Sequence, residues 1–329
     1  MRRSAFLTCV ILALLCTLAA ISLLAGRVWL SPSEVANGLF YPGTQLPSLI
    51  VLQLRLPRAV LAILVGAALG LSGAVLQGLT RNPLAEPGLL GVSSGAALGA
   101  VLAIYFGLAS ASSAIIPFLG LLGALAAVTL TFSLGGGRGT LALILAGAAV
   151  SALASALISL ALNLAPSPYA AYEIMTWLLG SLADRSWYHV VLAAPFILVG
   201  CTLLFIAGRS LDALALGEAQ AESLGVNLSR LRAMTLIGTA LAVGAATSVS
   251  GAIGFIGLVA PHLIRPFVGY QPRLVLVPAA LAGAVLLLTA DIATRLIHYG
   301  PEMKLGVFTS LIGTPFFFWL VVRLKGTSP

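Results

Sequence analysis

The chain has 329 residues, of which 60% are apolar and only 8% are charged, and its mean hydropathy is +1.11. Soluble domains carry about 25% charged residues, so this composition excludes an ordinary soluble enzyme or binding domain. The formal net charge of +8 would indicate nucleic-acid binding in a soluble chain, but basic residues also accumulate on the cytoplasmic side of membrane proteins, and we expect no nucleic-acid partner.

Long runs without any charged residue dominate the chain. Pro87 to Gly137, Gly139 to Tyr172 and Ala233 to Ile264 contain no Asp, Glu, Lys or Arg. A helix needs about 20 apolar residues to cross a bilayer, and soluble core helices rarely have such runs. The sequence therefore predicts one all-α polytopic membrane domain over residues 1–329, with ten spans at 4–26, 58–80, 91–108, 114–134, 141–163, 188–208, 230–250, 255–267, 274–297 and 305–324.

The first span follows two arginines, as the apolar core of a signal peptide would. Its charge-free stretch is longer than the roughly 7–15 residues of such a core, so we interpret it as a retained helix. With ten spans both termini lie on one side. Placing them in the cytoplasm leaves eleven Lys and Arg residues inside and six outside, as the positive-inside rule requires. All cysteines fall within apolar spans, which excludes a disulfide framework and a cysteine-bound metal: Cys9, Cys16 and Cys201.

Small residues recur every four positions in the second and third spans. The two series are Gly66, Gly70, Ala74 and Gly91, Gly95, Gly99. This spacing lets helix backbones approach closely, which favours association where lipid provides no hydrophobic driving force. We expect both series to be packing surfaces.

Two links between spans carry turn signals. Asn82-Pro83 precedes Leu84, and a glycine run at 135–139 precedes Thr140. Asn-Pro and Gly-Thr both start turns and helices, so turn formation is the structural interpretation of these residues.

The longest predicted cytoplasmic link is the segment 209–228, called the coupling segment below. It is predicted to form two very short helices hinged at Gly217 and stopped at Gly225. Glu218 lies in the first turn of the second helix, where an acidic residue complements the helix dipole. From these residues alone, the coupling segment has two possible interpretations: an amphipathic turn on the surface, or a docking element for a partner protein.

The eighth span, 255–267, is too short to cross a bilayer by itself, so it must lie against protein or line a cavity. We expect Pro261-His262 to end this helix. His262 has no second His, Cys or acid at ligand spacing, so we assign it neither a metal nor a catalytic role.

Ionisable groups that could couple transport to protons are almost absent. Asp291 comes nearest, but Arg295 follows one helical turn later, which predicts an ion pair. The chain also lacks the phosphate-binding pattern G-x-x-x-x-G-K-[ST], so we do not expect it to hydrolyse ATP. Energy therefore comes from a partner, or the protein is not an active transporter.

Five stretches, taken together, resemble the permease subunits of iron-siderophore, haem and cobalamin ABC importers, the FecCD-type family. They occur in the family's order and spacing between about residues 55 and 325. The stretches are Arg55-Leu56-Pro57-Arg58; Gln77-Gly78 with 82–91; Leu216-Gly217-Glu218 with Ala221 and Leu224-Gly225; Gly251 to Leu258 with Pro261-His262 and Arg265; and Ala290-Asp291.

The resemblance implies a type II ABC importer permease fold and a set of partners. These are a second copy of the chain, two ATPase subunits that hold ATP-Mg, and a periplasmic binding protein, with the permease spanning the bacterial inner membrane. No cofactor or metal is implied for this chain itself. A proton-coupled secondary transporter and a membrane-embedded enzyme are the other classes that we considered.

The resemblance also implies roles for individual residues. The residues implied in docking the binding protein are Arg55, Arg58 and Arg295. Those implied in coupling to the ATPase are Leu216, Gly217, Glu218, Ala221, Leu224 and Gly225. Those implied in the cytoplasmic gate are Asn82, Leu84 and Thr140. The alternatives are lipid-interface arginines for Arg55 and Arg58, and an ion pair with Asp291 for Arg295.

The chain departs from the family before the last span. Members often have Glu-Leu-Pro-x-Gly there, whereas this chain has Glu302-Met303-Lys304-Leu305-Gly306. We expect Lys304 to alter docking or to favour an anionic cargo. An iron complex is the expected cargo, with cobalamin as the alternative.

Overall fold

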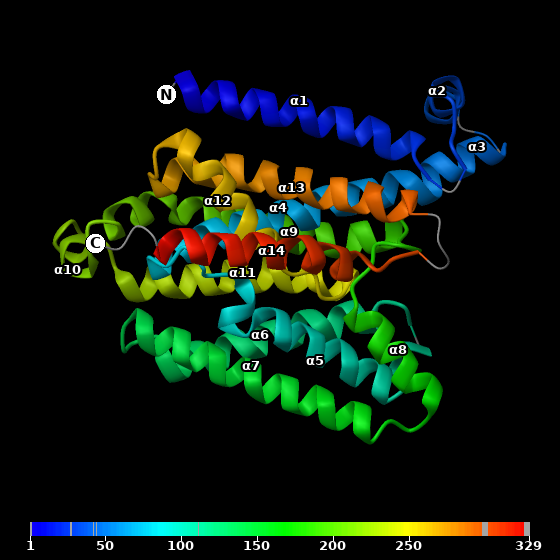
Figure 1. Ribbon diagram of the computed structural model, residues 1–329. Helices are drawn as coiled ribbons and strands as arrows, with labels where there is room; N and C mark the ends of the chain where they lie inside the picture. Colours follow the sequence, from blue (N-terminus) through cyan, green and yellow to red (C-terminus); the bar gives the residue numbers. More distant parts are fainter. Residues whose placement is uncertain are drawn as a thin grey trace.

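All ten predicted spans coincide with helices. The computed structural model describes residues 2–26, 28–41, 43, 45–110, 112–297 and 302–325, and the regular elements of this part are all helices, joined by turns and short loops (Figure 1). Seven of its helices are long and apolar enough to cross a membrane, and three shorter apolar helices complete the ten. In chain order they are α1 (Arg2–Leu24), α4 (Leu56–Thr80), α5 (Val92–Tyr105), α6 (Ile115–Gly135), α7 (Thr140–Asn163), α9 (Trp187–Leu214), α11 (Leu228–Ser250), α12 (Ile256–Val268), α13 (Pro272–Leu296) and α14 (Leu305–Lys325).

Several short helices lie between the spans. One of them, α10 (Glu218–Ser223), is the second short helix predicted for the coupling segment. The others were not predicted: α2 (Pro32–Phe40), α3 (Leu46–Leu49), the π-helix η1 (Ile50–Arg55), the 3₁₀ turns η2 (Pro87–Leu90) and η3 (Leu108–Ser110), and α8 (Pro168–Leu178). Two of these carry start signals in the sequence. Ser31 and Glu34 form a capping box on α2, and the Ser167 side chain caps α8. They were missed because they are too short to show hydrophobic periodicity.

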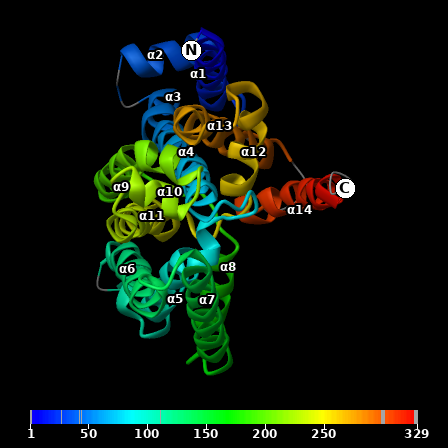
Figure 2. The same cartoon turned by 90° about the vertical axis from the view of Figure 1, so that its left-hand side faces the viewer.

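Helix α4 forms the centre of the bundle (Figure 2). It packs against α13, α12, α9 and α11, while α1 lies on the far side of α13, and α5, α6 and α7 form a separate layer beside α11. Helix α14 packs mainly against α12 and α13, with its first turn also touching the segment after α8, and projects from the bundle (Figure 2).

The predicted small-residue series are packing surfaces. A Cβ atom on Gly66 would lie 2.4 Å from the Gly283 carbonyl oxygen, and one on Gly95 would lie 2.5 Å from that of Gly123. Only glycine allows these backbones so close together. The first series thus fixes α4 on α13, and the second fixes α5 on α6.

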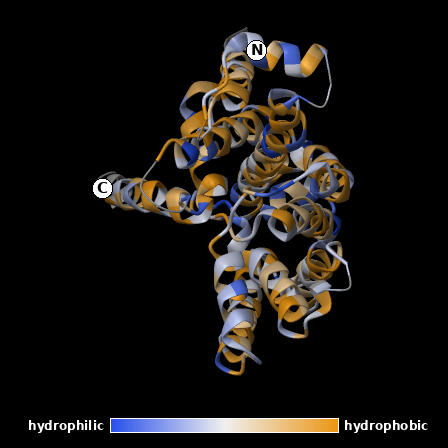
Figure 3. Ribbon diagram, turned by 90° about the vertical axis from the view of Figure 1, so that its right-hand side faces the viewer, coloured by the Kyte–Doolittle hydropathy of each residue, from blue (hydrophilic) through white to orange (hydrophobic). Residues whose placement is uncertain are grey.

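The short helices divide between the two ends of the bundle. The start of α1, the end of α14 and α10 lie at one end, called the α10 end; α2, α3 and α8 lie at the other, called the α2 end (Figure 1). The ribbon seen from the α2 end is mostly hydrophobic, with polar residues in a few places (Figure 3). Both ends of the chain thus lie on one side, as an even number of spans requires.

Two local predictions were wrong. The coupling segment does not contain two short helices, because α9 continues through Gly208 to Leu214 and replaces the first of them. The residues 209–214 are favourable for a helix and have no breaker before Gly217, so the span extends beyond the membrane-length run. Helix α12 does not end at Pro261-His262 but continues to Val268, with Pro261 and Pro266 inside it.

Candidate functional site

Two of the three predicted docking arginines are buried at the α2 end. Arg55, the last residue of η1, donates hydrogen bonds to the carbonyl oxygens of Leu23 (2.7 Å), Leu24 (2.8 Å) and Val28 (2.5 Å). These carbonyls lie at and beyond the end of α1, where helical partners are lacking. Arg55 therefore caps α1 and fixes it to the start of α4.

Arg295 reaches the same end of α1 from the other side. Its guanidinium donates to the Ser22 carbonyl oxygen (3.0 Å) and hydroxyl (2.9 Å). It also forms the predicted ion pair with Asp291, one turn earlier on α13, with Nε 3.0 Å from Oδ2. This contact confirms the ion pair that the sequence suggested.

Arg58 is the third arginine and the most accessible of them. Its Nε donates to Asp291 Oδ1 (2.8 Å), and its Nη2 pairs with Glu302 in the segment before α14. Asp291 is completely buried, whereas the Glu302 side chain is 27% exposed. The sequence analysis missed Glu302, since nothing in its spacing links it to a residue 244 positions earlier.

Arg58, Asp291, Arg295 and Glu302 therefore form one network of two positive and two negative charges, called the α2-end network. Arg55 and Arg295 use their donors within the chain and do not form an exposed cluster here. The contact of all three arginines with a binding protein is not tested by these interactions and stays a prediction.

The coupling segment forms a compact turn at the α10 end. Gly217 has a φ of +120°, which suits glycine, and precedes α10. Helix α10 ends in a Schellman motif, in which Val226 N donates to Ala221 O (3.0 Å) and Gly225 N to Glu222 O (2.9 Å). The predicted hinge at Gly217 and stop at Gly225 are thus confirmed.

The apolar residues of this turn divide into two groups. Ala221, on the inner face of α10, is fully buried. Leu216 and Leu224 flank the helix and are 66% and 65% exposed. Two exposed leucines on a rigid turn form an apolar surface of the kind that a partner protein covers.

The predicted gate residues lie at the same end. Asn82 Oδ1 accepts a hydrogen bond from Leu84 N (2.9 Å), so Asn82 forms the turn that its sequence context predicts. Thr140 is the first residue of α7, and its hydroxyl donates to Glu218 Oε1 at 2.6 Å. The structure therefore brings one predicted gate residue into contact with the coupling segment.

The contact with Thr140 also affects the pKa of the Glu218 carboxyl. The Thr140 hydroxyl, together with the Arg232 guanidinium 3.0 Å away, lowers the pKa of this carboxyl below its usual value, against the opposing effect of partial burial. Arg232, on α11, was not identified from the sequence. The only sequence feature that marks Arg232 is its position as a basic residue near the start of a span, which does not indicate a functional role.

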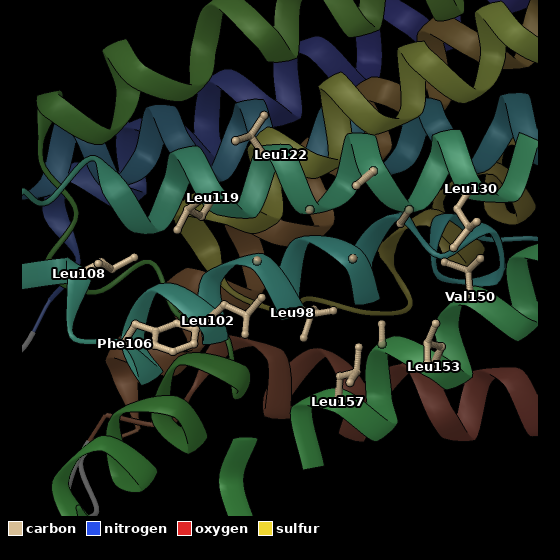
Figure 4. Close-up of a pocket in the computed structure, with 16 residues that line it drawn as sticks. Leu98, Leu102, Phe106, Leu108, Leu119, Leu122, Leu130, Val150, Leu153 and Leu157 are labelled. Atoms are coloured by element: carbon tan, nitrogen blue, oxygen red, sulfur yellow. The ribbon is translucent and has the colours of Figure 1, made fainter. Parts of the chain in front are cut away.

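Three cavities differ in what they could hold. A groove of about 440 Å³ between α5, α6 and α7 is lined by hydrocarbon side chains and glycines, among them Leu98, Leu102 and Leu157, so it offers nothing to a polar molecule (Figure 4). A cavity of about 610 Å³ lies beside α14 and includes Ser310 and Thr314.

The third cavity lies at the α2 end and has a volume of about 340 Å³. Its lining combines the aromatic side chains of Tyr172 and Trp177 with charged residues from three segments: Glu173, Asp184, Arg185 and Lys304. The buried Nε of Arg185 has no hydrogen-bond partner among the described residues. We call this space the α8 cavity.

A buried polar contact ties α12 to α4. Gln77 accepts a hydrogen bond from Arg265 (2.5 Å), and its amide donates to the carbonyl oxygens of Gly257 (3.4 Å) and Leu258 (3.5 Å). The short helix α12 thus lies against protein, as its length required.

Comparison with known proteins identifies the chain's relatives. The sequence profile of the FecCD transport family matches residues 12–323. The chain is 44% identical to the hemin transport system permease protein HmuU of Yersinia pestis, over 84% of each chain. It is 39% identical to a probable iron chelatin transport system permease protein of Helicobacter pylori, over 97% of each chain.

Two further relatives extend the comparison. The vitamin B12 import system permease protein BtuC of Klebsiella pneumoniae is 39% identical over 93% of this chain and 90% of its own. A solved structure of an ABC transporter of the metal-chelate type, in an inward-facing conformation, superposes with a TM-score of 0.86 at 34% identity, covering 96% of this chain and 98% of that one. With the profile match over almost its whole length, the chain belongs to the FecCD transport family and has the type II ABC importer permease fold.

Proposed function

We propose that this chain is the permease subunit of an ATP-driven importer that carries an iron complex, haem or a ferric siderophore, across the bacterial inner membrane. The observation that carries the proposal is the family match over residues 12–323, together with relatives named for hemin and iron chelatin transport. The chain itself is not the catalytic subunit, and ATP-Mg is held by two separate ATPase subunits.

The coupling segment is the proposed docking site for the ATPases. Leu216 and Leu224 present apolar side chains on either side of α10, and the Schellman motif at Gly225 holds the turn in one conformation. A rigid turn transmits force better than a mobile one. This assignment places the α10 end, with both ends of the chain, in the cytoplasm, and Asn82, Leu84 and Thr140 at the cytoplasmic gate.

A second copy of the chain is the proposed neighbour of α14. This helix projects from the bundle and exposes large apolar residues such as Leu311, Phe318 and Trp319 (Figure 2). In a homodimer, two such helices would enclose a path between the copies. The cavity beside α14, with its serine and threonine hydroxyls, would then face that path.

The α2 end is the proposed surface for the periplasmic binding protein. Of the three arginines, Arg58 is the one whose partner Glu302 is partly exposed, so an acidic residue of another protein can compete for it. Arg55 and Arg295 would contribute by holding α1, and with it the shape of this surface, while the positive charge of all three attracts acidic patches.

The α8 cavity bears on the choice between an iron complex and cobalamin. Arg185 and Lys304 bring two positive charges to its lining, alongside the carboxylates of Glu173 and Asp184, and aromatic side chains provide flat apolar surface. Haem and many ferric siderophores carry carboxylates, which pair with guanidinium and ammonium groups, whereas most side chains on the ring of cobalamin are amides. Cobalamin remains the second candidate because BtuC relatives are about as similar as the iron-chelate ones.

Transport in proteoliposomes tests the proposal. The chain is reconstituted with its cognate ATPase and binding protein, and accumulation of iron-labelled haem, a ferric siderophore and labelled cobalamin is measured with and without ATP. ATP-dependent accumulation of an iron complex supports the proposal. Accumulation of cobalamin alone establishes the second candidate, and accumulation without ATPase subunits contradicts the whole assignment.

A further inference from the structure

One carboxylate joins four elements at the α10 end. Glu218 Oε1, on α10, accepts the hydrogen bond from Thr140 Oγ1 (2.6 Å) at the start of α7 and lies 3.0 Å from Arg232 Nη2 on α11. Arg232 Nη1 in turn donates to the carbonyl oxygen of Gly136 (3.3 Å), just beyond α6. The loop 136–139 is therefore held at both ends by residues that meet at Glu218.

The contacts of this carboxylate show that it faces the protein. The Arg232 side chain is only 8% exposed, so it has little access to water and depends on Glu218 and Gly136 for its partners. The Glu218 side chain is one-third exposed and its Oε1 is held by Thr140 and Arg232, whereas Leu216 and Leu224 are exposed. The leucines thus face outward, and Glu218 faces the gate.

The loop that Glu218 holds has few other contacts. A Cβ atom on Gly137 or Gly139 would meet nothing within 4 Å, and Gly139 has a φ of +92°. Such glycines restrict the backbone little. The position of Thr140 relative to α10 therefore depends on the bond to Glu218. Arg81, adjacent to Asn82 on the other gate link, adds a favourable electrostatic interaction with the same carboxylate.

We propose that Glu218 and Arg232 form a latch that ties the coupling helix α10 to the gate loop 136–140 and so positions Thr140. This inference rests on the proposed function of the two regions, and it assigns Glu218 a positioning role inside the permease instead of a direct contact with the ATPase. When the ATPase displaces α10, the latch moves the start of α7 with it. The leucines bind the partner, and the latch transmits the displacement.

The first experiment measures the latch in the permease alone. A spin label attached at Arg138→Cys, in a Cys-free chain in lipid nanodiscs, reports the mobility of the gate loop. Glu218→Ala and Thr140→Val, which keeps the shape of threonine without its hydroxyl, are expected to mobilise the label. Thr140→Ser and Glu222→Ala, which removes the other carboxylate of α10, are expected to leave it unchanged. An immobile label in Glu218→Ala overturns the inference whether or not the chain is an importer.

The second experiment measures coupling in the complex with the ATPase and binding protein. A net hydrogen bond stabilises by about 0.5–1.5 kcal/mol, so Glu218→Ala should lower cargo transported per ATP hydrolysed by about two- to tenfold while ATPase subunits still co-purify. Adding Thr140→Val to Glu218→Ala should cause no further loss, because both changes remove the same hydrogen bond between Thr140 and Glu218.

Two results would overturn the latch in this setting. One is a loss of cargo transported per ATP, in the variant with both Glu218→Ala and Thr140→Val, that equals the product of the two single-variant losses. The other is loss of ATPase co-purification in Glu218→Ala to the same extent as in Leu216→Asp or Leu224→Asp, which would make Glu218 a partner contact. If wild-type permease itself fails to bind ATPases, the proposed function fails, and the spin-label result still decides the latch.

Discussion

Arg58 on α4 and Asp291 on α13 are 233 residues apart in the chain, and a hydrogen bond of 2.8 Å joins Arg58 Nε to Asp291 Oδ1. Arg295 approaches the other oxygen of the same carboxylate. The Asp291 side chain is therefore completely buried between two guanidinium partners and does not face a water-filled path. This geometry favours a structural role for the one acid within the spans that a proton-coupled transporter could have used.

Removing the Asp291 charge should destabilise the permease strongly. In Asp291→Asn two buried arginines lose their counter-charge, and breaking a buried pair from one side costs about 3–5 kcal/mol. Thermal unfolding of the detergent-solubilised protein measures the loss. The matched control is Glu302→Gln, whose side chain is more exposed and whose loss should cost about 1 kcal/mol or less. Equal stability of the two variants would contradict the assignment of Asp291 as the centre of the network.

Arg58 should be the arginine that contributes most to the electrostatic attraction between the permease and the binding protein. Arg58→Gln should weaken binding-protein affinity, since one exposed pair contributes about 0.2–1 kcal/mol, and each of two copies would lose one. Glu302→Gln should strengthen it, because Arg58 is then released from its internal partner. Titration of the binding protein onto permease nanodiscs measures both, and the wild-type affinity should fall with salt. Identical affinities and salt dependence in all three proteins would rule out docking through Arg58.

The spans, their order and the hinge glycines could be predicted because each depends on local sequence: charge-free length, or a residue type that allows a positive φ. Gly217 and Gly225 are examples, as is the i, i+4 pair of Asp291 and Arg295. The surroundings of the arginines could not be predicted in this way. Whether Arg55 faces water or the end of α1 depends on how α1 packs against α4, and nothing in the Arg-Leu-Pro-Arg stretch encodes that.

The same limit applies at the α10 end. Glu218 and Thr140 were each singled out, one for coupling and one for gating, but 78 residues separate them and no spacing rule connects them. Arg232 was overlooked because a basic residue near the start of a span is normally explained by the membrane surface. Long-range partners of charged residues require the packed structure, whereas the glycines that permit the packing are visible beforehand.

Breaking α10 should uncouple the ATPase from transport. In Ala221→Pro the ring removes the backbone N–H that donates to Gly217 O (3.0 Å), and the fully buried methyl group is replaced by a larger ring. We expect insertion and dimerisation to persist while ATP-driven uptake falls. Co-purification of the ATPase and uptake into proteoliposomes measure the effect, with Ala219→Ser on the exposed face of α10 as the control. Unchanged uptake in Ala221→Pro would show that the α10 fold is not needed for coupling.

Gly73 should tolerate no side chain. A Cβ atom there would lie 1.8 Å from the carbonyl oxygen of Gly257 on α12, and backbone cannot move aside as a flexible side chain can. Gly73→Ala should therefore cost about 1–3 kcal/mol or more, because α12 must separate from α4. Gly78→Ala is the matched control on the same helix. Its Cβ would be 3.5 Å from a Leu211 methyl group, an ordinary contact, so stability should stay equal or rise by about 0.4–1 kcal/mol. Thermal unfolding of both variants decides the matter, and equal melting temperatures would show that the two helices are not in this contact.

The gate loop should be released by acid but not by moderate changes around neutral pH. The Thr140 hydroxyl and Arg232 lower the pKa of Glu218 below its usual value of 4.5 in the folded protein, so the carboxylate form is the one that the latch stabilises. A group with a lowered pKa contributes fully above its unfolded value, and its contribution is lost as the pH falls through the folded value. A spin label at residue 138 should therefore stay immobile from about pH 8 down to about pH 4.5 and become mobile only below it. In Glu218→Gln, which cannot ionise, this transition should disappear, whereas Glu222→Ala should retain it. A transition near neutral pH, or one that survives in Glu218→Gln, would mean that another group controls the loop.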